Sequence, residues 1–316
     1  MIKYLLYPFS WLFIIAVYIR NKLYDWHILS SINSKLPVIS IGNIQVGGTG
    51  KTPFVIALCK QLISHNIRPL IITRGYKRNT KHQIILNNLD QYSAQEIGDE
   101  PYYIKTEIPS VAIIVDHNKK NAVKMANELL NIDCIILDDG FQSRYINKNL
   151  DIVLLDKSDV LNTVLLPAGR LREPIINLKR ADFVYHKGEK PFNVTYQMHQ
   201  YINNNKTIIK MIDVKGPCVA FCGIGNTNNF IEVLKNNNII IKQTVVFENH
   251  AKYDAQKYKK LKSENPNNLS FITTYKDFVK LDETFKNTYT IYVVELKTEI
   301  EDDQLLNTIK GLENEN

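Results

Sequence analysis

The chain has 316 residues, of which 45% are hydrophobic and 22% charged. This composition excludes a disordered chain and allows one large core or two modest ones. The formal charge of +7 favours anionic partners, but phosphates, anionic lipid headgroups and nucleic acid all meet that description. The cysteines form no CxxC pair and no metal-ligand spacing with histidine, so we expect free thiols in a reducing compartment.

The amino-terminal segment 5–19 reads LLYPFSWLFIIAVYI and is apolar or aromatic almost throughout, with Arg20 and Lys22 directly after it. It is shorter than the roughly 20 apolar residues that a spanning helix needs, so we expect a helix that lies in a membrane interface or a strongly tilted anchor. Trp11 and Trp26 favour this placement, because amphipathic rings are enriched at interfaces. A first helix buried against the rest of the protein is the alternative.

Short runs rich in Ile, Val and Leu then alternate with helical patterns, which is the rhythm of βαβ units. Predicted strands lie at 37–41, 70–73, 111–115, 134–137 and 152–155, and predicted helices at 53–64 and 121–130. We therefore predict an α/β fold with a doubly wound, mostly parallel sheet, which the glycine- and lysine-containing loop GGTGKT at 47–52 makes P-loop NTPase-like.

The α/β rhythm restarts after residue 215, following a polar, asparagine-rich stretch at 196–210. We take that stretch as a junction and predict a second, smaller α/β domain. The expected domains are a membrane-associated segment at 1–26, a P-loop domain at 27–211 and a carboxyl-terminal domain at 212–316.

A glycine-rich loop follows the first predicted strand and precedes a predicted helix, which is where a phosphate-binding loop belongs. Glycines let backbone N–H groups converge on phosphate oxygens, Lys51 can reach the β- and γ-phosphates, and Thr52 can ligate Mg²⁺. Gln45 stands where the full pattern has its first glycine, so a glycine turn without a ligand remains an alternative. The expected nucleotide-binding residues are Gln45, Val46, Gly47, Gly48, Thr49, Gly50, Lys51 and Thr52.

Two acidic pairs lie further along the chain. Asp138 and Asp139 end a predicted central strand, where ligands of an open α/β sheet gather, although an Asp-Asp-Gly turn is the plain alternative. Asp99 and Glu100 could accept a proton or organise Mg²⁺, or could cap a helix. Basic clusters at 74–78 and 169–174 fit phosphate clamps and solvated loops equally well.

The order of these motifs resembles one family, tetraacyldisaccharide 4′-kinase, the lipid A 4′-kinase of the inner membrane of Gram-negative bacteria. The matching stretches are IGNIQVGGTGKTP (41–53), TRGYKR (73–78), GDEP (98–101), LDDGFQSR (137–144), LDIVLLD (150–156), LLPAGRLREP (165–174), FCGIGN (221–226) and TTYKD (273–277). They run through most of the chain in the order of the family.

The resemblance implies ATP- and Mg²⁺-dependent phosphorylation of the 4′-hydroxyl of an acylated glucosamine disaccharide 1-phosphate. The implied partners are this lipid substrate and inner-membrane lipids, with no nucleic acid. The implied location is the cytoplasmic face of the bacterial inner membrane, with the amino-terminal segment as an anchor. A membrane-recruited P-loop ATPase switch is the rival, although no lysine lies between Asn43 and Lys51, where such switches carry one.

The resemblance also implies roles for individual residues. The expected catalytic residues are Asp99 as the base, Asp139 and His250; the expected metal ligands are Thr52, Asp138 and Glu100; and the expected substrate contacts are Arg74, Tyr76, Arg172 and Glu173. The chain departs from the family at Ala251, Ser143 and Tyr275, which replace a second histidine, a histidine and a glutamate. Roles that depend on those family side chains cannot be transferred.

Overall fold

The computed structural model describes residues 5–76, 78–156, 164–202, 205–224, 227–248 and 251–314. The chain divides into two compact units, Met1–Val194 with Thr298–Asn316, and Thr195–Lys297. The sequence predicted that the second domain would run from 212 to the carboxyl terminus. The division differs because the last helix, α11 (Asp303–Asn314), belongs to the first unit, a return that no local pattern announces.

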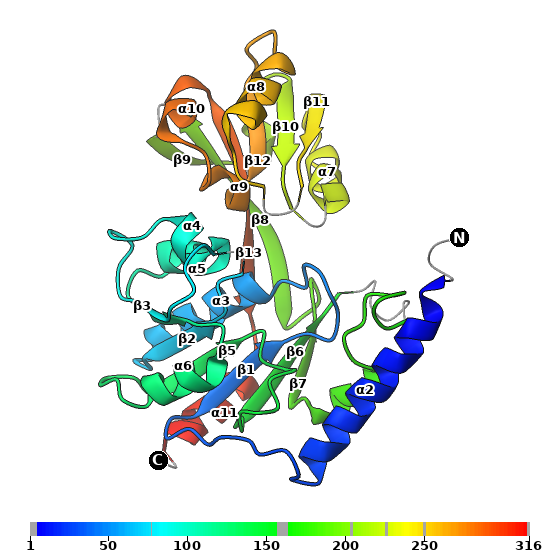
Figure 1. Ribbon diagram of the computed structural model, residues 1–316. Helices are drawn as coiled ribbons and strands as arrows, with labels where there is room; N and C mark the ends of the chain where they lie inside the picture. Colours follow the sequence, from blue (N-terminus) through cyan, green and yellow to red (C-terminus); the bar gives the residue numbers. More distant parts are fainter. Residues whose placement is uncertain are drawn as a thin grey trace. The chain divides into compact units, whose positions relative to one another are not determined.

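The first unit is built on a sheet whose described strands have the order β3-β4-β2-β5-β1-β6-β7 (Figure 1). The strands are β1 (Val38–Gly42), β2 (Pro69–Thr73), β3 (Ile84–Leu86), β4 (Ala112–Val115), β5 (Cys134–Asp138), β6 (Leu150–Leu155) and β7 (Phe183–His186). The pairings are parallel except for β3 with β4. The prediction of a mixed α/β fold with a mostly parallel sheet is confirmed.

Helices and short 3₁₀ turns connect these strands. They are α3 (Lys51–Ser64), α4 (Ala94–Ile97), α5 (Asp99–Glu107), α6 (Lys119–Ala126) and η2 (Ile175–Arg180). Strands β1, β2 and β5 are buried along their whole length, because crossover helices cover a parallel sheet on its faces. Consequently the residues that come after β1, β2 and β5 all emerge at one edge of the sheet.

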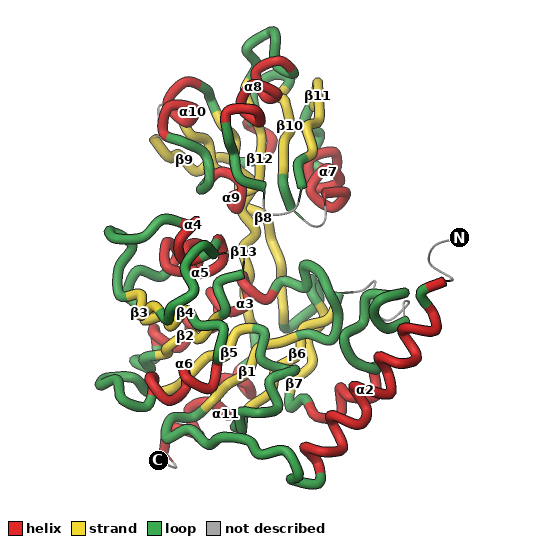
Figure 2. Tube along the Cα trace, viewed as in Figure 1, coloured by secondary structure: helices red, strands yellow, loops and turns green. Residues whose placement is uncertain are grey.

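Helix α2 (Tyr7–Asp25) lies beside this sheet in the same unit (Figures 1 and 2). Its buried residues Ser10, Val17 and Asn21 recur at helical spacing, and Phe13 and Ile14 pack against a core cluster that includes Phe141. Its other side exposes large apolar side chains: Phe9, Trp11, Leu12, Ile15, Tyr18 and Ile19. Among the described residues no helix has both the length and the apolar character to cross a membrane.

The second unit contains a sheet with the described strand order β11-β10-β12-β13-β8-β9. Its elements are β8 (Phe192–Ile202), β9 (Asn205–Ile209), η3 (Met211–Asp213), β10 (Cys218–Cys222), α7 (Thr227–Asn236), β11 (Ile241–Val246), α8 (Ala255–Ser263), β12 (Ser270–Thr274), α9 (Tyr275–Phe278), α10 (Glu283–Thr288) and β13 (Ile291–Ile300). The first residues of β8 and the last residues of β13 belong to the first unit. In the stretch 196–210, which we took as a junction between domains, residues 198–202 of β8 pair antiparallel with residues 205–209 of β9. The sequence did not indicate these strands because β9 is an exposed edge strand, which tolerates a polar sequence.

Two sequence motifs meet inside the second unit. The backbone N–H of Gly223, after β10, donates to Asp277 Oδ2 over 3.0 Å, and Thr274 Oγ1 donates to the same oxygen over 2.8 Å. The Asp277 carboxylate is fully buried. The motifs FCGIGN and TTYKD are thus joined by one carboxylate that ties two strand ends.

Candidate functional site

The glycine-rich loop connects β1 to α3 in the first unit. Gly47 and Gly50 have φ of 133° and 86°, a region that favours glycine. Helix α3 begins at Lys51 without a side-chain cap, so its first N–H groups remain directed at the loop. Such a helix start, with its positive dipole end, is suited to phosphate oxygens.

Lys51 is the first residue of α3, and its side chain contacts an acidic residue that follows strand β5. Its Nζ lies 3.5 Å from Asp139 Oδ1. The side chain of Thr52 is buried beside it, and Thr49 Oγ1 accepts a hydrogen bond from Asn43 Nδ2 over 3.0 Å. The expected lysine, threonine and aspartate are therefore brought together at the carboxyl edge of the sheet.

The turn that carries the two aspartates is held from below by a lysine that sequence reasoning missed. Lys119 is fully buried, and its Nζ donates to the backbone carbonyls of Asp138 and Asp139 over 2.5 and 2.8 Å. Asp139 has φ of 50°, and a Cβ on Gly140 would lie 2.5 Å from Ser40 Oγ. Nothing in the sequence around Lys119 marks it, because its partners are backbone atoms of residues far along the chain.

The two aspartates differ in charge environment. Burial, and then the neighbouring carboxylates of Glu100 and Asp139, raise the pKa of Asp138 to about 6. Burial also acts to raise the pKa of Asp139, but Lys51, Arg172 and Lys119 outweigh it and hold that pKa well below its usual value. The charged form of Asp139 is thus stabilised by neighbouring cations, whereas the charged form of Asp138 is disfavoured by burial and by two neighbouring carboxylates.

Thr73 is a second contributor that the sequence did not single out. It ends β2, next to β5 in the sheet, and its Oγ1 donates to Asp138 Oδ2 over 2.9 Å. This bond orients one carboxylate oxygen and leaves the other available to the site.

The arginine-rich segment after β6 lies directly against the loop. Arg172 donates to both carboxylate oxygens of Asp139 over 3.0 and 2.9 Å. Arg170 donates from Nε and from the terminal guanidinium nitrogen to the carbonyl of Val46, and its own carbonyl accepts from Val46 N–H over 2.8 Å. Gln45 is buried, and its backbone forms an isolated antiparallel β-bridge with Leu171. Arg170 was not among the predicted site residues, although its position two residues before Arg172 could have indicated it.

The loop after β2 and the start of α5 form the other side of the site. A Cβ on Gly98 would lie 3.0 Å from the Cα of Gly75, so these two glycine turns pack closely. Asp99 is the first residue of α5, and Arg74 and Tyr76 are exposed on the neighbouring loop. The close approach of the two turns brings the TRGYKR and GDEP motifs together.

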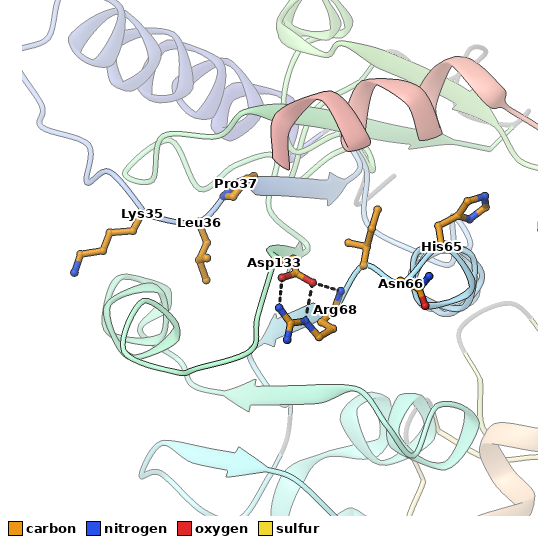
Figure 3. A pocket seen from close by; sticks show the side chains of 8 residues that line it. Lys35, Leu36, Pro37, His65, Asn66, Arg68 and Asp133 are labelled. Atoms are coloured by element: carbon orange, nitrogen blue, oxygen red, sulfur yellow. Dashed lines mark hydrogen bonds and ion pairs between the residues drawn. The ribbon is translucent and has the colours of Figure 1, made fainter. Parts of the chain in front are cut away.

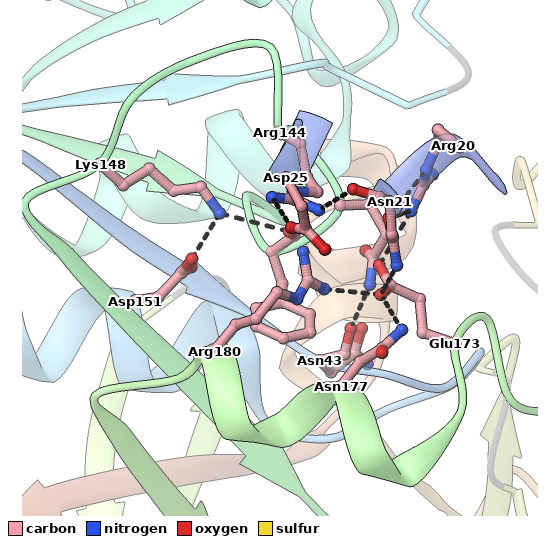
Figure 4. A network of polar contacts seen from close by, with 12 residues as sticks. Arg20, Asn21, Asp25, Asn43, Arg144, Lys148, Asp151, Glu173, Asn177 and Arg180 are labelled. Carbon is pink, nitrogen blue, oxygen red and sulfur yellow. Dashed lines mark hydrogen bonds and ion pairs between the residues drawn. The ribbon is translucent and has the colours of Figure 1, made fainter. Parts of the chain in front are cut away.

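Two predicted site residues stand apart from this group. Glu173 is fully buried and accepts hydrogen bonds from Arg20, Asn21, Asn177 and Arg180, so it lies inside the protein rather than on a substrate surface (Figure 4). Its placement shows a structural tie between α2 and η2. His250 lies outside the described residues.

A separate pocket of about 620 Å³ lies at the opposite edge of the sheet. Pro37, Arg68 and Asp133, which line it, directly precede β1, β2 and β5. Arg68 and Asp133 form a two-pronged ion pair there (Figure 3). The strand ends that carry the glycine-rich loop and the aspartates point away from this pocket.

A glycine-rich loop, a lysine, an acidic turn and an arginine segment at the carboxyl edge of a mostly parallel sheet define an α/β protein of the nucleotide-phosphate-binding class. The family Tetraacyldisaccharide-1-P 4′-kinase matches residues 2–313 of the chain. The tetraacyldisaccharide 4′-kinase of Aquifex aeolicus is 33% identical over 97% of this chain and 97% of that protein. The enzyme of the same name from Chlorobium phaeobacteroides is 34% identical over 88% of this chain and 86% of its own.

The chain is also similar in three-dimensional structure to a solved member of this family. The crystal structure of the "apo" form of LpxK from Aquifex aeolicus in complex with ATP is similar with a TM-score of 0.80 at 30% identity, and covers 99% of each chain. The chain belongs to the tetraacyldisaccharide 4′-kinase family.

Proposed function

We propose that this protein transfers the γ-phosphate of ATP to the 4′-hydroxyl of an acylated glucosamine disaccharide 1-phosphate, in the pathway of lipid A. The observation that carries the proposal is the cluster in which Lys51 and Arg172 both contact Asp139 beside the start of α3. Family membership supplies the identity of the acceptor. The cluster supplies what phosphoryl transfer needs, namely fixed cations and N–H groups around a highly charged group.

In this proposal the glycine-rich loop from Gln45 to Thr52 holds the nucleotide. Backbone N–H groups of the loop and of the α3 start bind the β- and γ-phosphates, and Lys51 neutralises them. Arg172 lies 2.9 Å from Asp139 and can turn one guanidinium nitrogen to the transferring phosphoryl group. Arg74 and Tyr76, exposed on the neighbouring loop, are available to the substrate.

The donor set at the sheet edge fits Mg²⁺. Asp138, Glu100 and Thr52 supply only oxygen atoms, which is the chemistry that this ion prefers. Burial, and then the neighbouring carboxylates of Glu100 and Asp139, raise the pKa of Asp138, so this carboxylate lies where a cation would offset negative charge. A bound Mg²⁺ would neutralise charge on the phosphates, and these three residues would hold it or its waters.

Asp99 is the proposed base. It begins α5, whose first turn carries Asp99 and Glu100, and Gly98 fixes that turn against Gly75. Asp99 accepts the proton of the 4′-hydroxyl as that oxygen attacks phosphorus.

The exposed apolar side of α2 supports docking at a membrane surface. Trp11 and Phe9 are 67% and 59% exposed, while Arg20 and Lys22 lie at the end of the same helix. A helix with this arrangement lies in the headgroup region, where basic residues meet anionic lipid. We place the protein at the cytoplasmic face of the inner membrane, where the acyl chains of the substrate stay in the bilayer.

The test is transfer of labelled γ-phosphate from ATP to a detergent-dispersed tetraacyl disaccharide 1-phosphate in the presence of Mg²⁺. We expect Lys51→Ala to lower the rate by roughly 10²–10³-fold and Asp99→Asn by roughly 10²–10⁴-fold. Lys60→Ala is the matched control, because Lys60 lies exposed on the same helix in an ion pair with Glu107. Lipid-independent ATP hydrolysis without labelled lipid would contradict the kinase and favour the ATPase switch.

A further inference from the structure

The segment 164–173 lies between α2 and the phosphate loop, and α2 holds it near both ends. Near its start, Ser10 Oγ donates to the carbonyl of Leu165 over 3.0 Å and accepts the N–H of Ala168 over 3.0 Å. Ser10 is only 3% exposed. This buried hydroxyl lies in the apolar first half of α2 and, besides a 3.4 Å contact with the carbonyl of Leu6 in its own helix, makes both of these hydrogen bonds to the segment.

At the other end of the segment, α2 holds Glu173. Asn21 Nδ2 and a guanidinium nitrogen of Arg20 donate to the two carboxylate oxygens over 3.3 and 3.2 Å. Arg180 and Asn177, from η2, donate to Glu173 Oε2 over 2.6 and 2.8 Å. Figure 4 shows these side chains converging on the carboxylate from α2 on one side and from η2 on the other.

Between these two attachments the segment folds back on itself. The N–H of Gly169 donates to Leu165 O over 2.8 Å, and Leu166 N–H donates to Leu171 O over 2.8 Å. A Cβ on Gly169 would lie 1.9 Å from the carbonyl oxygen of Val164, so this turn leaves no room for any other residue. A turn that is closed in this way transmits a displacement of its ends instead of absorbing it.

The same turn presents both arginines to the site. The Arg170 guanidinium donates a hydrogen bond to the carbonyl of Val46 in the glycine-rich loop, and the Arg172 guanidinium donates to the Asp139 carboxylate. Arg172 is adjacent in sequence to Glu173, which α2 holds. One short path therefore joins α2 to a cation of the phosphate site.

We propose that Ser10 and Asn21 are positioning residues for Arg172, so that α2 is a part of the ATP site and not only a contact for lipid. This inference rests on the role proposed above for Arg172 at the transferring phosphate. The hydrogen bonds from α2 hold the segment 164–173 in the position from which the Arg172 guanidinium reaches both Asp139 and the phosphoryl group.

The experiment measures kcat and the KM for lipid of the full chain in mixed micelles, with ATP saturating. Ser10→Ala removes both hydrogen bonds with a minimal change of volume, and Asn21→Ala removes the amide at the other attachment. We expect each to lower kcat by roughly tenfold with the KM for lipid unchanged, because an interaction specific to the transition state is misplaced. Asp25→Asn is the matched control, because Asp25 also lies on α2. The substitution weakens the 2.8 Å ion pair between Asp25 and Arg144 and leaves the hydrogen bonds of Ser10 and Asn21 to the segment in place, so kcat should stay as in the wild type.

A double-mutant cycle separates positioning from general loosening of the fold. In an Arg172→Ala background, Ser10→Ala should have no further effect on kcat, because the group that it positions is gone. An undiminished kcat in Ser10→Ala and Asn21→Ala would overturn the inference, and so would a loss that persists in the Arg172→Ala background. Full activity of Arg172→Ala itself would instead remove the role assigned to Arg172 and the inference with it, while labelled transfer by the wild type would still support the kinase.

Discussion

Replacement of Glu173 tests whether this residue is structural, as its burial indicates, or touches substrate, as the resemblance implied. Glu173→Ala removes a fully buried carboxylate that accepts from four side chains. It leaves Arg180, whose guanidinium lies 4.4 Å from the ring centre of Phe141, without its 2.6 Å partner. A buried cation without its anion is strongly unfavourable.

The expected loss of stability arises from this uncompensated charge. Removing one partner of a buried ion pair costs about 3–5 kcal/mol. Arg180 dominates this loss, because its side chain is 19% exposed, whereas that of Arg20 is 37% exposed and solvent screens it. For a unit of this size each kcal/mol corresponds to roughly 2–4 °C in Tm, so we expect a fall of about 6–20 °C. Glu173→Gln should cost less, because it keeps the volume and one acceptor oxygen.

Thermal unfolding of wild type, Glu173→Ala and Glu173→Gln measures this directly. Lys190→Ala is the control, because its 3.0 Å pair with Glu301 is exposed and should contribute at most about 1 kcal/mol. The structural role is refuted if Glu173→Ala unfolds at the wild-type temperature while its KM for lipid rises. That result would return Glu173 to the substrate surface.

Three further predictions address other parts of the molecule. Trp11→Asp on the exposed side of α2 should lower binding to anionic vesicles by roughly ten- to a hundredfold, measured by sedimentation, while ATP affinity stays unchanged; equal binding would remove the membrane role of this side. Gly75→Ala should cost about 1–3 kcal/mol in chemical denaturation, because Gly75 has φ of 61° and a Cβ there would lie 2.5 Å from two atoms, whereas Gly311→Ala, with open space, should not destabilise; equal effects would contradict the steric argument. Burial acts to raise the pKa of Glu295, but hydrogen bonds from His199 and Lys297 outweigh burial and lower that pKa from 4.5 to about 2. The contribution of Glu295 to stability is therefore present above pH 4.5 and lost as the pH falls towards 2. The stability difference between wild type and Glu295→Gln should shrink over that range, and a constant difference would refute the linkage.

Much of the site can be predicted from local sequence patterns. The buried strands β1 and β5 were evident as apolar β-branched runs, and the residues directly after each strand of a parallel sheet lie at its carboxyl edge. The loop that leads to Lys51 and the two aspartates at the end of β5 could therefore be assigned to one edge of the sheet from the sequence alone. The ion pair between Lys51 and Asp139 agrees with that assignment.

The sequence by itself determined the central strands β1, β2, β4, β5 and β6, the glycine-rich loop after β1 and the acidic turn at the end of β5, because each depends on residues close together in the chain. Only the tertiary structure decided that Glu173 is buried against α2, that Lys119 supports the acidic turn, and that α11 returns to the first unit. Glu173 and Asn21 are 152 residues apart, and the partners of Lys119 are backbone carbonyls that have the same chemistry at every residue. Such contacts arise from packing between distant segments, and no local periodicity or propensity encodes which segments will meet.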